Sequence, residues 1–444
     1  MIQHSHPSAG RKVRIVNLGC SKNQVDSESI LGEFGRAGFS LARPGDISAV
    51  TLLNTCGFIE PAKEESIQEI LDAIRSRGPG EKIVVAGCLS QRYMKELQTD
   101  IPEADLFVGT YKPGEILERL GLTSTLPSDC KVGASPRTLM GEEPHHAFLK
   151  IAEGCNRVCG FCAIPGMRGK QKSRTIADLV MEARQLESWG VKEISLIAQD
   201  LTYFGREAGG RENLEQLLQA LLKETGVSWF RLMYAYPAFL TDGLLETMAV
   251  NPRICKYLDM PVQHASDRML KAMRRNYDSA DLRAQIGRLY AAMPSLSLRT
   301  TVLAGYPGET ETDFQELLDF VGETEFRHLG GFVYSDEDET HAFNLAEKVP
   351  PDIARERLDR LMDLQRQIAS DENQARIGTM AEVIIDSPGT DETSVYLART
   401  EGDAPEVDGR VLITGKTEAE IGTFRRVKIT GSREFDLEAE LLPA

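Results

Sequence analysis

Short apolar runs alternate with amphipathic helical patterns along most of the chain, and no other feature restricts the fold as strongly. In the first third, the β-branched runs KVRIVNLG, AVTLLNT and KIVVAG are separated by the helical patterns SESILGEFGRAGF and EESIQEILDAIRS. This alternation is typical of a parallel sheet with helices on its faces. We predict an open parallel-sheet α/β domain over residues 12–135, preceded by a tail over residues 1–11.

A second series of strand and helix patterns fills residues 141–372. Its six apolar runs are AFLKIAEG, EISLIAQD, FRLMYAYP, KYLDMPV, LSLRTTVLAGYPG and LGGFVYS, and a long polar helix follows at about 350–375. Six such units indicate a partial (βα)6 barrel, in which the site lies at the carboxyl ends of the strands.

Residues 373–444 contain short strand patterns divided by Gly, Asp and Pro, from MAEVIIDSPG to FDLEAELL. They predict a small all-β barrel of the size of oligonucleotide-binding modules. Acidic residues outnumber basic ones by 14 to 8 from Ala375 to Ala444, and the whole chain has a net charge of −16. Because a surface that binds RNA phosphates is usually basic, this balance disfavours a large RNA-binding surface.

The composition is that of an ordinary globular protein, with 41% apolar and 27% charged residues. No run approaches the roughly 18 uninterrupted apolar residues of a membrane span. The opening stretch MIQHSHPSAGRK lacks the apolar segment of a secretion signal. We therefore expect a cytoplasmic protein without a membrane partner.

Three cysteines follow the three strands of the first domain. Cys20, Cys56 and Cys88 come just after the strand patterns, with spacings of 36 and 32 residues, about one βα unit each. Because the carboxyl ends of parallel strands meet at one edge of a sheet, these side chains are expected to lie together. A single free cysteine is often only a small buried residue. Three at equivalent positions favour a shared ligand.

Three further cysteines lie within eight residues. Cys155, Cys159 and Cys162 have the spacing C-x3-C-x2-C in the stretch EGCNRVCGFCAIPGMRGKQKSR. A disulfide framework is not expected in a reducing compartment. Three thiolates on a four-iron cluster leave one iron open, which is typical of a catalytic site. The alternative is a zinc knuckle with His145 or His146 as the fourth ligand.

The C-x3-C-x2-C motif resembles that of the radical S-adenosylmethionine (SAM) enzymes, and the order of domains resembles the methylthiotransferases among them. NLGCSKNQVDSE and NTCGFIEPAKEES match the first domain of that family, and the last domain resembles a TRAM domain. The resemblance implies SAM and two [4Fe-4S] clusters, together with a low-potential electron donor such as flavodoxin or ferredoxin. One cluster would be held by Cys155, Cys159 and Cys162, and the other by Cys20, Cys56 and Cys88.

Two branches of the family differ at the second cysteine motif. CAIPGMRGKQKSR resembles the branch that acts on a ribosomal protein, and Met167 and Lys170 are the residues that separate it from the tRNA branch. The resemblance implies addition of a methylthio group to the β-carbon of an aspartate in the small-subunit ribosomal protein numbered twelve. That substrate is basic and suits an acidic enzyme. The alternative is a tRNA methylthiotransferase that acts on isopentenyladenosine beside the anticodon.

Further site residues are expected at the strand ends and in the basic run after the cysteines. By the resemblance, Phe161 packs on the SAM adenine, and Arg168 and Arg174 receive the substrate aspartate or the SAM carboxylate. Gln199, Gln263 and Arg299, in three different strand patterns, are expected to contact SAM. The run at 274–277 lines the substrate entrance or forms a helix-capping loop, and Cys130 and Cys255 are ordinary thiols.

Two hypotheses of another kind also fit the cysteines. One is an iron–sulfur or zinc protein that binds ribosomes without catalysis. The other is a redox sensor with a single cluster, which predicts about four irons per chain rather than about eight.

Overall fold

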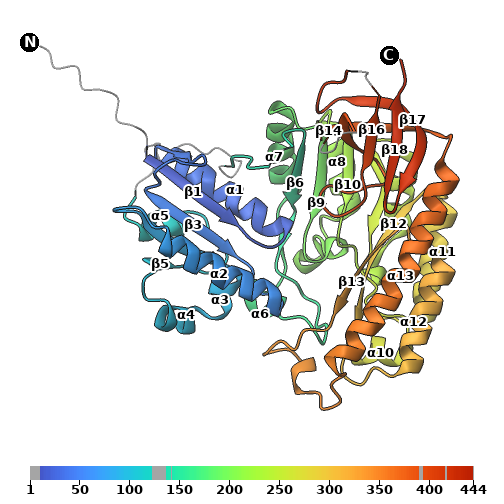
Figure 1. Ribbon diagram of the computed structural model, residues 1–444, viewed down its shortest axis with the longest axis horizontal. Coiled ribbons are helices and arrows are strands. Elements are labelled where there is room, and N and C mark those ends of the chain that lie inside the picture. The colour runs from blue at the N-terminus through green and yellow to red at the C-terminus, as the bar shows by residue number, and fades with distance from the viewer. Residues whose placement is uncertain (1–10, 123–136, 142, 390–393, 416–417, 444) are drawn as a thin grey trace, which may run out of the picture. The chain divides into compact units, whose positions relative to one another are not determined.

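The computed structural model describes residues 11–122, 137–141, 143–389, 394–415 and 418–443 (Figure 1). The chain forms two compact units: Met1–Met140 with Ala163–Gly169, and Gly141–Cys162 with Lys170–Ala444. The second and third predicted domains thus share one unit. The predicted tail lies outside the described residues except for Arg11, which begins a strand, and Cys130 also lies outside them.

The first unit is built on a five-stranded sheet of order β2-β1-β3-β4-β5, with all neighbouring strands parallel. The open parallel-sheet prediction is confirmed. Two edge strands were missed because segments of two and three residues are too short to show a period. The strands are β1 Arg11–Asn17, β2 Phe39–Leu41, β3 Val50–Thr55, β4 Lys82–Gly87 and β5 Leu106–Phe107; the helices are α1 Ser21–Arg36, α2 Glu60–Arg75, α3 Cys88–Arg92, α4 Met94–Asp100, α5 Glu115–Arg119 and α6 Ile164–Arg168.

Both faces of this sheet are covered, as the continuous apolar runs of its central strands require. Successive residues of a strand point to opposite faces. Leu52 packs in a core with Phe34 of α1, whereas the next residue, Leu53, packs in a second core with Ile70 of α2. The carboxyl ends of β1, β3 and β4 are therefore held side by side between two helical layers.

The second unit contains six parallel strands in consecutive order, β6 to β13, with no pairing between the first and the last among the described residues (Figure 1). The predicted partial (βα)6 barrel is confirmed. The six strands are β6 His146–Lys150, β9 Glu193–Ile197, β10 Trp229–Leu232, β11 Ile254–Asp259, β12 Ser297–Ala304 and β13 His328–Val333. A small hairpin pairs β7 Ala152–Glu153 with β8 Lys172–Ser173, and the helices are α7 Ile176–Ser188, α8 Leu214–Glu224, α9 Asp242–Val250, α10 Asp267–Ala272, α11 Ser279–Ala292 and α12 Glu311–Thr324.

A long helix, α13 Pro351–Arg376, leads into a closed five-stranded barrel. Alternate residues such as Val383 and Ile385 fill its interior. This confirms the small all-β domain. Its strands are β14 Met380–Pro388, β15 Tyr396–Thr400, β16 Val411–Thr414, β17 Phe424–Arg433 and β18 Asp436–Leu441.

Buried ion pairs fasten this terminal barrel to the amino ends of the βα strands. Glu193, the first residue of β9, accepts bonds of 2.7 Å from both Arg231 of β10 and Arg399 of β15. Such a network is costly to break because each unpaired charge would stay buried. The carboxyl ends of the same strands take no part in these ion pairs. No helix in the described part of the chain combines the length and apolar character of a bilayer span.

Candidate functional site

The first cysteine centre forms where three neighbouring strands end. Cys20 caps α1 after β1, Cys56 directly follows β3, and Cys88 directly follows β4 and begins α3. Because β1, β3 and β4 are adjacent and parallel, the structure brings the three predicted positions to one edge.

Two glycines let these three turns touch. A Cβ on Gly19 would lie 3.1 Å from Sγ of Cys56, and its φ of +91° is one that favours glycine. A Cβ on Gly57 would lie 2.7 Å from the Cα of Leu89. Gly19 thus leaves room for the side chain of Cys56, and Gly57 leaves room for the backbone that follows Cys88.

The chemistry of this centre calls for a cation. Its three cysteines are free thiols. Burial raises the pKa of Cys88 to about 11 and also raises the pKa of Cys56, and the neighbouring cysteine sulfurs oppose ionisation further. Three thiolates at this edge therefore require a positively charged partner. A coordinated metal supplies one, because it deprotonates its thiol ligands outright.

Arg168 lies in this first centre rather than on an open surface. It ends α6, is buried, and donates from Nε to Sγ of Cys88 at 3.3 Å. Its other nitrogens donate to Asp26 at 3.2 Å and to Asn23 at 2.5 Å. Arg168 thus orients a cysteine of the centre, and its contact with substrate stays a prediction.

The second cysteine centre follows the carboxyl end of β6 in the other unit. The backbone N–H of Arg157 donates to Sγ of Cys155 at 3.3 Å, and Nη1 of Arg275 donates to Sγ of Cys159 at 3.4 Å. Cys162 N–H donates to the carbonyl of Cys159 at 3.2 Å and closes the turn. Burial raises the pKa of Cys155 to about 11, so here too a metal would have to displace the proton. N–H groups aimed at sulfur suit thiolate ligands of a cluster.

The turn between these cysteines is clamped. Gly160 exchanges backbone bonds of 2.8 Å with Met273 and Ala342, and a Cβ at that position would lie 2.6 Å from the Tyr306 hydroxyl. Phe161 packs against the apolar cluster that contains Met273 and Tyr306. Its contact with the SAM adenine stays a prediction.

Gln199 and Gln263 lie beyond the carboxyl ends of β9 and β11. Oε1 of Gln199 is buried and has no hydrogen-bond partner among the described residues, so it is available to a ligand. Gln263 has a left-handed φ of 73° and makes backbone bonds of 2.8 Å to Thr301 and Leu303 of β12. A non-glycine residue held there stores strain that is typical of ligand sites. The unpartnered oxygen and this geometry suit a polar ligand such as SAM.

Two predicted arginines do not join this group. Arg299 is the third residue of β12 and pairs with Asp259 at 3.1 Å and with Asp408 of the terminal barrel at 3.2 Å. The expectation of a strand-end position was wrong, because Arg299 comes early in a long strand. Arg174 is held by Asp178 and Glu182 of α7 at 2.7 and 2.6 Å, and its contact with substrate stays a prediction.

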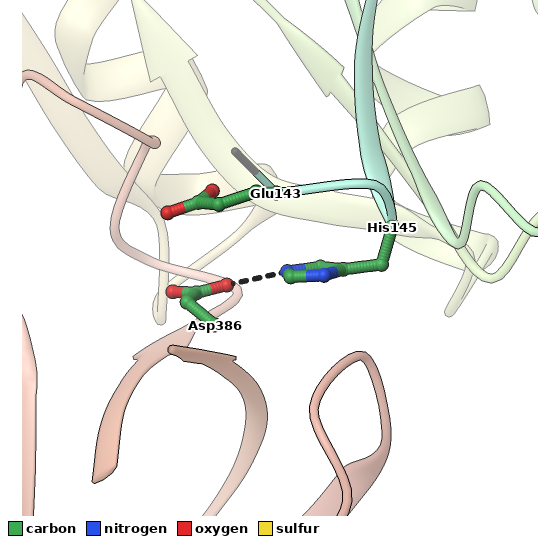
Figure 2. Close-up of side chains that lie close together, drawn as sticks. All are labelled: Glu143, His145 and Asp386. Atoms are coloured by element: carbon green, nitrogen blue, oxygen red, sulfur yellow. Dashed lines mark hydrogen bonds and ion pairs between the residues drawn. The ribbon is translucent and has the colours of Figure 1, made fainter. Parts of the chain in front are cut away.

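The histidines proposed for a zinc knuckle have other partners. Figure 2 shows Nε2 of His145 directed at Asp386, 2.8 Å away, with Glu143 beside them. The guanidinium of Arg399 already bonds both oxygens of Asp386, at 2.7 and 2.9 Å, and takes the place of a cation. His146 bonds Ser195 at 3.1 Å. His146 is the first residue of β6, and the cysteines follow its last residue. Because a strand rises by roughly 3.3 Å per residue, the length of β6 separates His146 from the cysteines. The zinc-knuckle hypothesis is therefore wrong for these two histidines.

Sequence reasoning missed Arg157 and Arg275 as parts of the second centre. Arg157 pairs with Asp200 at 2.6 Å and lies over the ring of Tyr236. Arg275 also lies over that ring. The run at 274–277 was predicted to line the substrate entrance or to form a helix-capping loop, not to contact a cysteine. Cys255 lies within β11, not before it, and is buried.

A parallel partial barrel whose first strand leads into three free cysteines is the architecture of a radical SAM enzyme. The sequence profile of the "Radical SAM superfamily" matches residues 149–321, that of "Uncharacterized protein family UPF0004" matches residues 12–109, and that of "TRAM domain" matches residues 377–442. The solved structure of the radical S-adenosylmethionine methyltransferase TsrM from Kitasatospora setae, with tryptophan substrate and a SAM analog bound, covers 81% of this chain and 89% of its own. Its TM-score is 0.55 at 12% sequence identity, which shows the fold alone.

The chain belongs to the RimO family of radical SAM methylthiotransferases. The ribosomal protein uS12 methylthiotransferase RimO of Desulforudis audaxviator (strain MP104C) is 42% identical to it over 97% of each chain. The protein of the same name from Sorangium cellulosum (strain So ce56) is 43% identical over 98% of this chain and 91% of its own. Membership implies SAM and a [4Fe-4S] cluster as cofactors.

Proposed function

We propose that this enzyme adds a methylthio group to the β-carbon of an aspartate in ribosomal protein uS12, with two [4Fe-4S] clusters and SAM as cofactors. One observation carries the proposal. The chain has two separate trios of free cysteines, each at the carboxyl edge of its own parallel sheet. The names of the relatives supply the substrate.

The second centre is proposed to hold the cluster that binds SAM. Cys155, Cys159 and Cys162 would be its three ligands, and the N–H groups of Arg157 and Arg275 would stabilise two of the sulfurs. When bound, this cluster supplies the electron that cleaves SAM to a radical able to remove hydrogen from an unactivated carbon. The free Oε1 of Gln199 is suited to accept a hydrogen bond from SAM.

The first centre is proposed to hold the other cluster. Cys20, Cys56 and Cys88 would be its ligands, and Arg168 would orient Cys88 from the side of α6. When bound, this cluster carries the sulfur that becomes the methylthio group. A second open metal position is the feature that a methylthiotransferase needs and that a simple radical enzyme does not.

Charge supports a basic protein as substrate. The chain has a net charge of −16, and its terminal domain is acidic. Complementary charge speeds the encounter of two proteins and suppresses wrong partners. We further propose a cytoplasmic location, where thiols stay reduced, and an acidic low-potential carrier such as flavodoxin or ferredoxin as electron donor.

The test is anaerobic reconstitution with iron and sulfide, followed by incubation with SAM, a reductant and uS12. We expect a mass gain of one methylthio group on an aspartate and about eight irons per chain, two clusters of four. Modification of a prenylated tRNA but not of uS12 would replace the proposed substrate. Zinc without iron would contradict the radical mechanism.

A further inference from the structure

A surface hollow of about 630 Å³ lies beside the turn that carries Cys155 and Cys159. Val158, between these cysteines, forms one wall, and the segment from Asp267 to Asp278 forms the rest. The Val158 side chain is 64% exposed. Single exposed apolar residues are common on protein surfaces; this one matters because it lies in the turn between two of the cysteines.

The hollow is rimmed by cations that have no partner. Lys271 and Arg274 are exposed and form no ion pair among the described residues. The two acids of the same rim are used within the fold: Asp267 accepts from the backbone N–H of Ser279, and Asp278 from that of Asp281, both at 2.8 Å. These bonds leave both carboxylates charged, so the lining holds three cations, Lys271, Arg274 and Arg275, against two anions, and its net charge is +1 in a chain of net charge −16.

A direct chain of contacts joins the hollow to a cluster ligand. Arg275 lines the hollow and donates from Nη1 to Sγ of Cys159 at 3.4 Å. Its Nε donates to the Tyr277 hydroxyl at 2.6 Å, and Nη2 to the carbonyl of Pro261 at 2.8 Å. Val158 is bonded to Cys159, so their Cα atoms are about 3.8 Å apart. A molecule seated here touches residues next to the ligand sulfur.

We propose that the surface formed by Val158, Lys271, Arg274 and Arg275 docks an acidic one-electron carrier protein. This inference rests on the proposed function of the second cysteine centre. One electron would pass from the reduced carrier, which would be oxidised by one unit, to the cluster that Cys155, Cys159 and Cys162 would hold, which would be reduced by one unit.

The physical character of the surface fits this occupant better than the substrate. Redox encounters are small, transient and steered by complementary charge, and a single exposed apolar residue ringed by cations suits such a contact. The basic substrate would be repelled by Lys271 and Arg274. The negative charge that we propose to attract the basic substrate is not found at this surface.

The test compares two full-length variants that change the net charge equally. Lys271→Glu with Arg274→Glu reverses the rim. Lys192→Glu with Lys223→Glu is the control, because both lysines are exposed and neither lines the hollow: Lys192 directly precedes β9, and Lys223 lies in the last turn of α8. We measure the binding of oxidised flavodoxin by calorimetry at low and high salt. We then measure the rate at which reduced flavodoxin reduces the reconstituted cluster, and the amount of cluster that dithionite reduces.

The rim variant is expected to bind flavodoxin roughly tenfold more weakly at low salt, with a smaller salt dependence and a correspondingly slower reduction. The control should stay within about twofold of the unmodified protein. Dithionite should reduce the same amount of cluster in all three proteins. Equal weakening in both variants, or none in the rim variant, would overturn the docking surface. A protein whose cluster dithionite cannot reduce would instead contradict the proposed function, which separates the two failures.

Val158→Ser gives an independent check that removes the apolar contact and leaves every charge of the rim in place. It should weaken flavodoxin binding while dithionite reduction is unchanged. If the variant binds flavodoxin as tightly as the unmodified protein or more tightly, the apolar contact is not part of the interface. If an RNA oligonucleotide binds the unmodified rim more tightly than flavodoxin does, the occupant is an RNA and the proposal is wrong.

Discussion

The two cysteine centres contain the same groups, three cysteines and an arginine, but the surroundings of the arginine differ. Each has three free cysteines, and in each an arginine N–H points at one sulfur, at 3.3 Å in the first centre and 3.4 Å in the second. Arg168 is neutralised by Asp26, whereas no carboxylate among the described residues pairs with Arg275. The first centre is buried at Cys88 and exposed at Cys20, whereas the second has no exposed cysteine but carries an exposed valine in its turn. The difference therefore lies in the arginine: its charge is paired in the first centre, and in the second it faces a cysteine sulfur without a carboxylate partner among the described residues.

Removing one trio at a time gives the sharpest separation of the two centres. Replacing Cys155, Cys159 and Cys162 by alanine should abolish SAM cleavage and leave about four irons per chain. Replacing Cys20, Cys56 and Cys88 should also leave about four irons but retain SAM cleavage, while methylthio transfer is lost. Iron analysis and assay of 5′-deoxyadenosine check both. Loss of SAM cleavage in the second variant would show that the centres do not work separately.

Arg168→Met should destabilise the first unit strongly. The change leaves the buried carboxylate of Asp26 without its guanidinium partner, which costs about 3–5 kcal/mol for a buried pair. Denaturant unfolding of the full chain measures the loss. Adding Asp26→Asn should restore most of it, because no unpaired charge is then left.

Arg137→Met is the matched control for Arg168. It breaks another buried arginine–carboxylate pair of the same unit, Arg137 with Glu28, and neither of these described residues has a hydrogen bond to Cys20, Cys56 or Cys88. The control should lose stability but keep the full iron content, whereas Arg168→Met should lose both. Equal iron content in the two variants would remove Arg168 from the centre.

The metal-free protein should lose stability at high pH. Burial raises the folded-state pKa of Cys88 and of Cys155 to about 11, from 9.0 for a free thiol. Between these values the unfolded chain loses protons that the folded chain keeps, so stability is intact below pH 9 and falls as pH rises towards 11. Each thiol contributes at most about 3 kcal/mol, at about 1.4 kcal/mol per pKa unit.

Cluster loading should remove the part of this pH dependence that comes from the ligand thiols, because those are already deprotonated. Cys255, whose pKa burial raises to about 12, keeps its own part. Urea unfolding of the metal-free and loaded protein from pH 8 to 11 gives the comparison. Cys88→Ser and Cys155→Ser should each remove the part of the fall in unfolding free energy with pH that comes from that thiol. Because each thiol belongs to one centre, unequal slopes would rank the burial of the two centres.

Gly19→Ala should give the smallest of these losses, with an effect confined to the first centre. A left-handed backbone costs about 1–2 kcal/mol for a non-glycine residue. The new methyl group would also lie 2.9 Å from Cβ of Cys56. Gly38→Ala is the control, because its φ of +85° is similar and nothing lies within 4 Å. Only Gly19→Ala should reduce iron content.

Periodicity and topology were enough to predict most of the fold. Long strands such as β12 and amphipathic helices such as α8 can be predicted from the spacing of their apolar residues. The adjacency of parallel strands was enough to predict that Cys20, Cys56 and Cys88 lie together. The two-residue strand β5 could not be seen because a period needs more residues.

The surroundings of the cysteines were less accessible to sequence reasoning. Arg168 follows the second motif within six residues of Cys162, yet α6 packs with the first unit. Arg275 lies more than a hundred residues from Cys159, and no local pattern links the two. Arg299 was placed at a strand end because its position inside a long apolar run could not be resolved. Which side chains support a site depends on long-range packing that spacing alone does not encode.

The inclusion of Ala163–Gly169 in the first unit has a consequence for biosynthesis. Domains near the amino terminus commonly fold while the rest of a chain is still being translated. Here the polypeptide up to Met140 would emerge without α6, so Asp26 and Cys88 would wait for Arg168 before their packing is complete. A recombinant fragment that stops at Met140 would stay in that unfinished condition permanently, whereas a permuted gene that appends residues 163–169 to it would supply the missing piece.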